Sequence, residues 1–383
     1  MLKKNWKKKI KMKENLNCGI FISDEGFGHM VRQRAIINEL LKKFPTIDIT
    51  IFTSKNIFYL KETFENRINY LNISMHLRSI KNLDGSLNVN KTKNIFKGWE
   101  RNVVPWKKKV RPYFKNFNFI ISDCVPEAFD LAKKFNIPSF GISHFTWDWF
   151  FENVCKINSL ELNKIQNSFN KCDYFLFPPF TPLKILNKYK KKISHVNFII
   201  GNFKVKLKKN KFQKCLIMDN GTRSLSRLIN KTVPYLKKIK NIKFYVCIDH
   251  LEEKSKNEIF TSKNIVPVSG LKKMHEKVEE SDFIIARGGF NTISECLVLK
   301  KPALFFNEKN NPEISENLRL IHKKYGLAYL INQNDWGKNF KKKLNSFIKK
   351  DGIKINNKLR RKKFKSNGAQ QVVKIISKKL KNF

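Results

Sequence analysis

The most constraining feature of this sequence is an alternation of short apolar runs with longer amphipathic segments, which occurs in two series along the chain. Runs rich in β-branched and aromatic residues are typical of strands buried on both faces. Their alternation with helical patterns predicts βα units around parallel sheets. The expected strands are 17–23, 47–53, 118–122, 138–142 and 173–177 in the first series, and 214–219, 243–248, 282–286 and 302–306 in the second. The expected helices include 30–43 and 126–135 in the first series, and 222–238, 271–279, 291–299 and 314–324 in the second.

The two series indicate two α/β domains. A chain of 383 residues is long for one hydrophobic core and suits two. We expect a first Rossmann-like domain at 1–203, a lysine-rich linker at 204–212, a second Rossmann-like domain at 213–360 and a basic helical tail at 361–383. Ligands of open α/β sheets bind at the carboxyl ends of the strands, so the cleft between the two sheets is the expected site.

The composition narrows the classes of function. Hydrophobic residues make up 41% of the chain, which excludes a disordered protein. The net charge of +47 leaves two interpretations open: attraction to polyanions such as an anionic membrane, or a codon bias toward lysine, asparagine and isoleucine. Seven scattered cysteines without a Cys-x-x-Cys pair predict reduced core residues, and we expect no metal site. No run reaches the ~20 apolar residues of a spanning helix. The expected location is the cytoplasm, with peripheral attachment to the inner face of the membrane left open.

Two motifs mark the first domain. Gly26 and Gly28 lie between the first expected strand and its helix, where glycine allows a tight turn and a close approach of backbone to ligand. His29 follows at the mouth of the cleft, where a neutral imidazole could take a proton from an acceptor hydroxyl. Asp123 ends another strand and could orient that histidine. The alternative is that it caps the helix that starts near Pro126, and spacing alone slightly favours the cap.

Two further motifs mark the second domain. Gly221, Thr222 and Arg223 follow its first strand, where they could contact phosphate or simply cap a helix. The more informative motif is a strand that runs into two glycines and then a helix. The free N–H groups of that helix would hold a diphosphate, and a glutamate one turn further on could accept the ribose hydroxyls. Its residues are Arg287, Gly288, Gly289, Asn291, Thr292 and Glu295.

These motifs resemble those of inverting GT-B glycosyltransferases. The nearest similarity is to the peptidoglycan N-acetylglucosaminyltransferase of family 28 and the UDP-glycosyltransferases of family 1. Residues 119–126 and 143–149 also resemble the glycosyltransferase-like domain of plant L-arabinokinase. The resemblance spans about residues 18–330. It implies an α/β chain of GT-B fold, with two Rossmann-like domains facing across a cleft and the C-terminal helix crossing back to the first domain.

The resemblance also implies roles for particular residues. His29 matches the general base and Asp123 the residue that orients it. Gly221 and Thr222 match a loop that approaches the phosphates, and Leu271 lies near the backbone that reads the base. Gly289, Asn291 and Thr292 match the diphosphate-binding turn, and Glu295 matches the ribose-binding glutamate.

The sequence departs from the family in two places. Ile314 stands where a sugar-contacting glutamine is usual, although Glu313 could substitute for it and Asn317 fits the pattern. Asp24 and Glu25 precede the glycines where the family has a glycine-rich lead. In a later aromatic cluster, Trp147 could stack on an acceptor sugar, but a cluster this apolar is more often core.

We therefore expect an inverting glycosyltransferase that uses a nucleotide-sugar, such as UDP-N-acetylglucosamine or another UDP-sugar, and an unidentified acceptor. Surface polysaccharide or glycolipid synthesis is the expected setting. No cofactor or metal is expected. A sugar-nucleotide epimerase or a hydrolase of the same fold is the first alternative. The second is a basic nucleic-acid- or membrane-binding protein with a vestigial cleft. The basic residues are spread throughout the chain without the aromatic interleaving of an RNA platform, so we expect no specific nucleic-acid partner.

Overall fold

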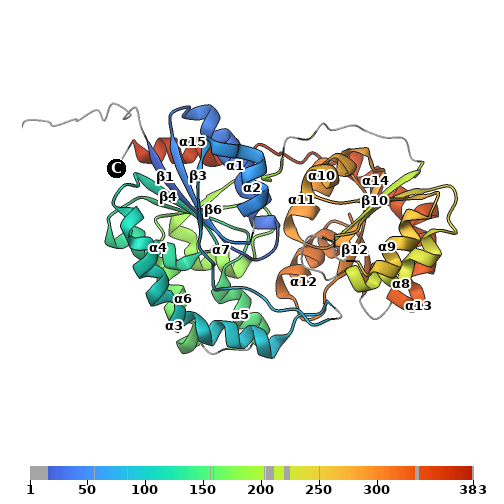
Figure 1. Cartoon of the computed structure of the whole chain (residues 1–383), viewed down its shortest axis with the longest axis horizontal. Coiled ribbons are helices and arrows are strands. Elements are labelled where there is room, and N and C mark those ends of the chain that lie inside the picture. The colour runs from blue at the N-terminus through green and yellow to red at the C-terminus, as the bar shows by residue number, and fades with distance from the viewer. Residues whose placement is uncertain are drawn as a thin grey trace, which may run out of the picture.

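The computed structural model has two lobes, each built on one parallel sheet (Figure 1). It describes residues 16–381 except 56, 84, 156, 158, 202, 204–210, 220–224, 250 and 333–335. The predicted linker therefore lies almost wholly outside the described residues. None of the helices within the described ranges is long and apolar enough to cross a membrane.

The first lobe holds a seven-stranded sheet in the order β3-β2-β1-β4-β5-β6-β7, and every pairing is parallel. Its strands are β1 (Asn17–Ile22), β2 (Asp48–Thr53), β3 (Asn69–Asn72), β4 (Phe119–Asp123), β5 (Ser139–Ile142), β6 (Tyr174–Phe177) and β7 (Ile193–His195). Its helices are α1 (Gly28–Lys43), α2 (Ile57–Phe64), α3 (Val89–Phe114), α4 (Pro126–Lys134), α5 (Trp147–Cys155), α6 (Ser159–Asn170) and α7 (Leu183–Tyr189).

The second lobe holds a six-stranded parallel sheet in the order β10-β9-β8-β11-β12-β13. Its strands are β8 (Lys214–Met218), β9 (Lys243–Cys247), β10 (Ile265–Val268), β11 (Phe283–Arg287), β12 (Ala303–Asn307) and β13 (Tyr329–Asn332). Its helices are α8 (Ser226–Leu236), α9 (Glu253–Phe260), α10 (Leu271–Glu280), α11 (Phe290–Val298), α12 (Pro312–Leu318), α13 (Trp336–Ser346) and α14 (Gly352–Arg361). The expected α/β class with two Rossmann-like domains is confirmed, and both sheets are doubly wound.

The last helix, α15 (Gly368–Leu380), returns to the first lobe and lies beside α1 (Figure 1). Val372, Val373 and Ile376 of this helix share a buried cluster with Ile36 and Leu40 of α1. The chain thus crosses between the lobes twice.

The topology places the predicted motifs where the strand order reverses. In the first sheet β1 and β4 are neighbours, and their carboxyl ends carry the turn before α1 and Asp123. In the second sheet β8 and β11 are neighbours, and β11 leads directly into the two glycines before α11. Crevices at such positions are where open α/β sheets bind ligands.

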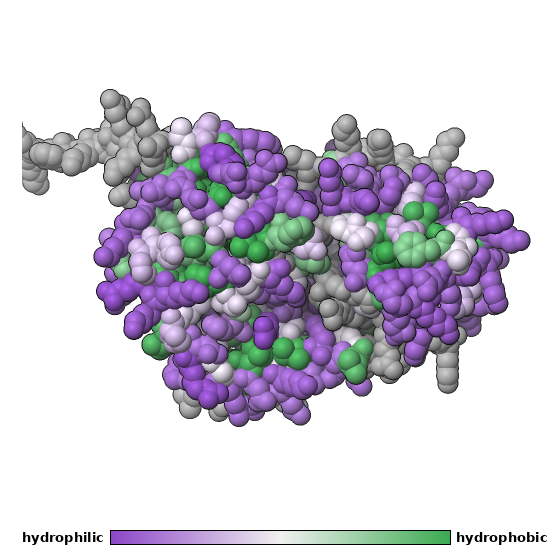
Figure 2. Space-filling view, viewed as in Figure 1, coloured by the Kyte–Doolittle hydropathy of each residue, from purple (hydrophilic) through white to green (hydrophobic). Residues whose placement is uncertain are grey.

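The hydrophilic character of the surface is consistent with the high net charge of the chain. Hydrophilic residues cover most of the face shown in Figure 2, and hydrophobic residues form small, separated groups.

Candidate active site

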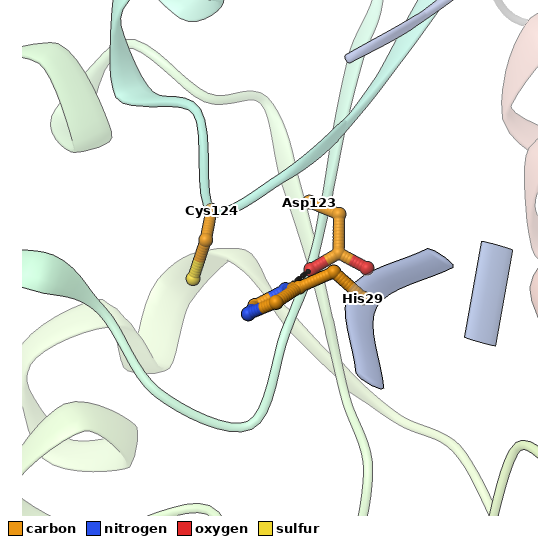
Figure 3. A group of neighbouring side chains, drawn as sticks. All are labelled: His29, Asp123 and Cys124. Atoms are coloured by element: carbon orange, nitrogen blue, oxygen red, sulfur yellow. Dashed lines mark hydrogen bonds and ion pairs between the residues drawn. The ribbon is translucent and has the colours of Figure 1, made fainter. Parts of the chain in front are cut away.

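A buried histidine–aspartate pair lies at the carboxyl edge of the first sheet. Nδ1 of His29 is 2.7 Å from Oδ1 of Asp123, and the two side chains are almost completely buried. Because an ionised carboxylate only accepts hydrogen bonds, Nδ1 carries a proton, and Nε2 is the nitrogen through which a neutral ring can accept another. The second ring nitrogen lies on the side of the ring away from Asp123 (Figure 3). His29 also lines the cleft between the lobes, so a base at Nε2 can reach a substrate there.

Two more side chains of α1 hold the same carboxylate, and the sequence reasoning missed them both. Arg32 donates from Nε to Oδ2 at 2.9 Å and from a terminal nitrogen to Oδ1 at 2.6 Å, and Gln33 donates to Oδ2 at 2.9 Å. Burial opposes ionisation of Asp123, but Arg32 and His29 outweigh it and hold the pKa of the carboxyl well below its usual range. The spacing from His29 to Arg32 and Gln33 puts all three on one face of α1, which is a signal the sequence did contain.

These contacts decide between the two interpretations of Asp123. Its carboxylate accepts hydrogen bonds from α1. The N-cap of α4 is Val125, and no side chain caps that helix. Asp123 therefore orients the histidine and does not cap α4.

His29, Asp123 and Cys124 form a group of potential metal ligands, with donor atoms within 4.8 Å of one another (Figure 3). The group does not fit a cation well. Both oxygens of Asp123 are already bonded to Arg32, whose positive charge would repel a metal ion. Burial raises the pKa of the Cys124 thiol, so it is protonated, and the sulfur lies 3.0 Å from Oγ of Ser143.

Asp24 and Glu25, which depart from the family's glycine-rich lead, hold neighbouring segments of the first lobe. The carboxylate of Asp24 accepts five hydrogen bonds, four from residues 53–55 and one from the backbone N–H of Met75 at 2.7 Å. Glu25 accepts from the backbone and hydroxyl of Ser79. The acidic pair thus fixes the course of the segment that follows β3.

The second lobe contributes the turn between β11 and α11. A Cβ at Gly288 would lie 2.6 Å from the side chain of Leu318, so only glycine fits there. Gly289 is the N-cap of α11 and offers no side-chain cap. Nδ2 of Asn317 donates to the carbonyl of Gly288 at 3.4 Å, so Asn317 stabilises the turn. An uncapped helix N-terminus behind two glycines is suited to an anion such as a diphosphate.

The two halves of the predicted site face each other. Nδ2 of Asn291, in the first turn of α11, donates to the carbonyl oxygen of Gly28 in the first turn of α1. A Cβ at Gly28 would lie 3.4 Å from the same nitrogen, and Gly26 has a positive φ of 67°. The two glycines allow a tight turn and a close approach of the two lobes, whereas the sequence pattern predicted a close approach of backbone to ligand.

Glu295 lies on α11 one turn beyond Asn291, and Thr292 lines the same small cavity. Glu295 is buried, with an exposed fraction of 6%. Burial raises its pKa to about 7, although the charge of Arg34 opposes the shift. The cavity has a volume of about 60 Å³, far below the ~300–1,000 Å³ of typical ligand pockets. A nucleotide would therefore enter only after the lobes move apart.

An ion-pair network also joins the lobes. Lys81, in the segment after β3, pairs with Glu308 of the second lobe. Nε of Arg287 lies 2.5 Å from the same carboxylate, and Leu87 donates its backbone N–H to the carbonyl of Lys309 at 3.2 Å. Arg287, predicted to contact the nucleotide-sugar, lies in this network between the lobes. Lys81 and Glu308 were not found from the sequence.

A second histidine lies in the cleft. Nε2 of His144 is 3.0 Å from Oε1 of Glu313, and its ring stacks on Phe290 with a centroid distance of 4.3 Å. Burial lowers the pKa of His144, so the ring is neutral. Burial would raise the pKa of Glu313, but the hydrogen bond from His144 and the charge of Arg287 lower it to about 2. His144 must then donate from Nε2, which leaves its buried Nδ1 as an acceptor without a partner among the residues that the structure describes.

Other predicted contacts are placed differently. Trp147 has no exposed surface, donates its indole N–H to the carbonyl of Cys124 at 2.9 Å and packs on Phe145, Phe150 and Phe151. Its predicted contact with an acceptor is wrong, because the aromatic cluster is core. Leu271 begins α10. Gly221, Thr222 and Arg223 lie outside the described residues.

Comparison with known proteins gives one family match. Residues 220–374 match the family model described as the glycosyltransferase family 28 C-terminal domain. None of the curated proteins compared matches the chain in sequence.

Solved structures match over nearly the whole chain. A UDP-glucosyltransferase from Polygonum tinctorium is 11% identical, with a TM-score of 0.66, covering 96% of this chain and 99% of its own. MurG from Acinetobacter baumannii is 14% identical, with a TM-score of 0.60 and coverage of 95% and 99%. UGT71G1 from Medicago truncatula, complexed with UDP-glucose, is 12% identical, with a TM-score of 0.64 and coverage of 97% and 99%. These similarities establish the fold. Together with the family match, they identify the chain as a GT-B glycosyltransferase whose second lobe carries a family 28 C-terminal domain.

Proposed function

We propose that the chain transfers a sugar from a UDP-sugar to an acceptor hydroxyl with inversion at the anomeric carbon. The observation that carries the proposal is the His29–Asp123 pair, bonded at 2.7 Å and facing the uncapped N-terminus of α11 across the cleft. A base and an anion-binding helix end on opposite walls are what a single displacement needs.

The donor binds mainly to the second lobe. Its diphosphate lies at the turn formed by Gly289, Asn291 and Thr292, and its ribose hydroxyls bind the carboxylate of Glu295. Glu313 is ionised and its Oε1 already accepts from His144, so its remaining lone pairs accept hydroxyl groups of the donor sugar. Gly221, Thr222 and Arg223 complete the phosphate contacts, and the backbone near Leu271 reads the base.

The reaction is one step at the anomeric carbon. The acceptor oxygen attacks that carbon while its proton passes to Nε2 of His29. The bond between the anomeric carbon and the phosphate oxygen breaks, and the electron pair leaves with UDP. Asp123 stabilises the resulting imidazolium, and Arg32 and Gln33 keep the carboxylate in place. The N–H groups at the start of α11 stabilise the charge that develops on the diphosphate.

The acceptor approaches from the first lobe, beside Gly26 and Gly28. A net charge of +47 favours an anionic membrane surface near the enzyme, which suits an acceptor in lipid-linked or surface polysaccharide synthesis.

The test compares His29→Ala with the unsubstituted chain. UDP release from a panel of UDP-sugars is measured with and without candidate acceptors. The substitution should lower kcat by about 10²- to 10⁴-fold and change the Kd for UDP by less than about twofold. His195→Ala, at an exposed histidine on β7, is the matched control and should change neither.

Each outcome separates the alternatives. An equal loss of turnover and UDP binding would contradict the role of His29 as base. Acceptor-independent release of free sugar would indicate a hydrolase, and conversion of the sugar without a transfer product would indicate an epimerase. Retention of the anomeric configuration, seen by NMR of the product, would contradict a single displacement.

A further inference from the structure

The largest hollow described between the lobes is not the one beside His29. It is an open groove of about 1,360 Å³ farther out along the boundary. One wall is formed by α2 of the first lobe, and the other by residues 269–270 and by α10 of the second lobe. In Figure 1 these helices flank the boundary between the lobes.

The wall of the first lobe carries a row of three aromatic rings. Phe27, directly before α1, packs edge-on against Tyr59 with a centroid distance of 5.1 Å, and Tyr59 packs edge-on against Phe58 at 5.7 Å. The row starts at the turn that carries Gly28 and ends in the groove, where Phe58 is 63% exposed. An aromatic side chain held at this exposure presents a free apolar face to whatever occupies the groove.

The opposite wall is a turn with an accessible backbone. Asp249 accepts hydrogen bonds from the hydroxyl of Ser269 at 2.5 Å and from the N–H of Gly270 at 3.4 Å. Gly270 has a positive φ of 79°, and no atom lies within 4 Å of a Cβ placed there. The carbonyl of Gly270 accepts from the N–H of Met274 at 3.1 Å, so the turn offers a planar heterocycle an open face without side-chain cover.

The groove adjoins the cavity that Glu295 lines. His275 of α10 lines both spaces, and Arg34 of α1, whose charge acts on Glu295, lies on the groove wall. When the ribose of a nucleotide binds Glu295, the groove is the neighbouring space into which its base can extend.

We propose that Phe58, supported by Tyr59, stacks on the base of the bound donor nucleotide, so that the first lobe contributes an aromatic wall to a base subsite otherwise formed by the second. This inference rests on the proposed function. Stacking on an aromatic ring strengthens the binding of a base by about tenfold or more. A base that contacts both lobes also favours closure of the first lobe over the bound donor.

The experiment measures the Kd of UDP by calorimetry for the unsubstituted chain, Phe58→Ala and Phe58→Trp. Phe58→Ala should weaken binding by about tenfold, which corresponds to ~1.4 kcal/mol, and Phe58→Trp should keep or strengthen it. The control is Phe260→Ala, because Phe260 ends α9 with the same exposed fraction of 63% and does not line the groove. It should leave the Kd unchanged.

Saturation-transfer NMR provides a second readout. In the unsubstituted chain the base protons of UDP should receive more saturation than the ribose anomeric proton, and Phe58→Ala should lower this ratio. Unchanged affinity and an unchanged ratio in Phe58→Ala, with UDP still binding, would overturn this inference alone. An equal loss in Phe260→Ala would overturn it as well. Absence of UDP binding in the unsubstituted chain would overturn the proposed function and this inference together.

Discussion

The protonation of Glu295 should control donor binding near neutral pH. The carboxyl group is almost wholly buried, and burial raises its pKa from 4.5 to about 7 despite the opposing charge of Arg34. The ribose hydroxyls need an acceptor, so the ionised form should bind the donor better. For a group with a pKa of about 7, proton competition should weaken the affinity by about tenfold between pH 8 and pH 6.

The same shift predicts an effect on the free energy of unfolding. The folded state binds the Glu295 proton more tightly than the unfolded chain, so stability from this group is present below about pH 4.5 and is lost as the pH rises through about 7. A difference of about 2.5 pKa units corresponds to ~3 kcal/mol at pH 8. Glu295→Gln removes the buried charge while keeping the shape. It should therefore stabilise the ligand-free protein at pH 8 by up to about 3 kcal/mol, and by much less at pH 5.

The assay is calorimetric titration with UDP-glucose between pH 6 and pH 8, because its phosphodiesters do not titrate in this range and UDP does. Urea unfolding at pH 5 and pH 8 follows the stability. Glu295→Gln should bind the donor weakly and without pH dependence. Arg34→Leu should move the midpoint of the wild-type profile to higher pH. An affinity that is constant within about twofold across the range in the unsubstituted chain would refute the reasoning.

Three further substitutions test the supporting structure. Asp123→Asn leaves the guanidinium of Arg32 buried without its counter-charge. It should therefore lower the free energy of unfolding by about 3–5 kcal/mol and also lower turnover. A free energy of urea unfolding within about 1 kcal/mol of that of the unsubstituted chain would contradict this. Asp24→Ala removes five hydrogen bonds and should cost about 3 kcal/mol, with faster amide exchange in residues 73–80; unchanged exchange there would show that the segment is held by other contacts. Gly368→Ala would place a Cβ 2.2 Å from the carbonyl oxygen of Asn197 and should lower stability by about 1–3 kcal/mol, and an unchanged Tm would show that α15 shifts at no cost.

The strands predicted from the sequence are those in the interior of the two sheets. They are buried on both faces, so their sequences are nearly continuous apolar runs. All four strands that were missed are sheet edges, where one side of the backbone has no partner and the side chains are half-exposed and mixed in character. These strands are β3, β7, β10 and β13. The long helix α3 was also missed, since Pro105 and Pro112 interrupt its pattern.

The part of the site that lies at the carboxyl ends of the strands was predictable from the sequence. His29 and Asp123 follow neighbouring parallel strands, so the sheet brings them together once the strand order is known. Contacts that depend on how the lobes dock were not predictable in this way. The bond between His144 and Glu313, for example, arises only because α12 of the other lobe packs beside α5. The same holds for Lys81, which meets its partner 227 residues further along the chain.

The most direct test of the central claim, a nucleotide site on α11, is calorimetric titration of the full chain with UDP at pH 8. The comparison is between the unsubstituted chain, Glu295→Ala and Glu253→Ala, the last being a control at an exposed glutamate of α9. We predict micromolar binding of UDP that Glu295→Ala weakens at least tenfold and Glu253→Ala leaves unchanged. Failure of the unsubstituted chain to bind UDP, or equal binding by Glu295→Ala, would contradict the assignment of the donor site.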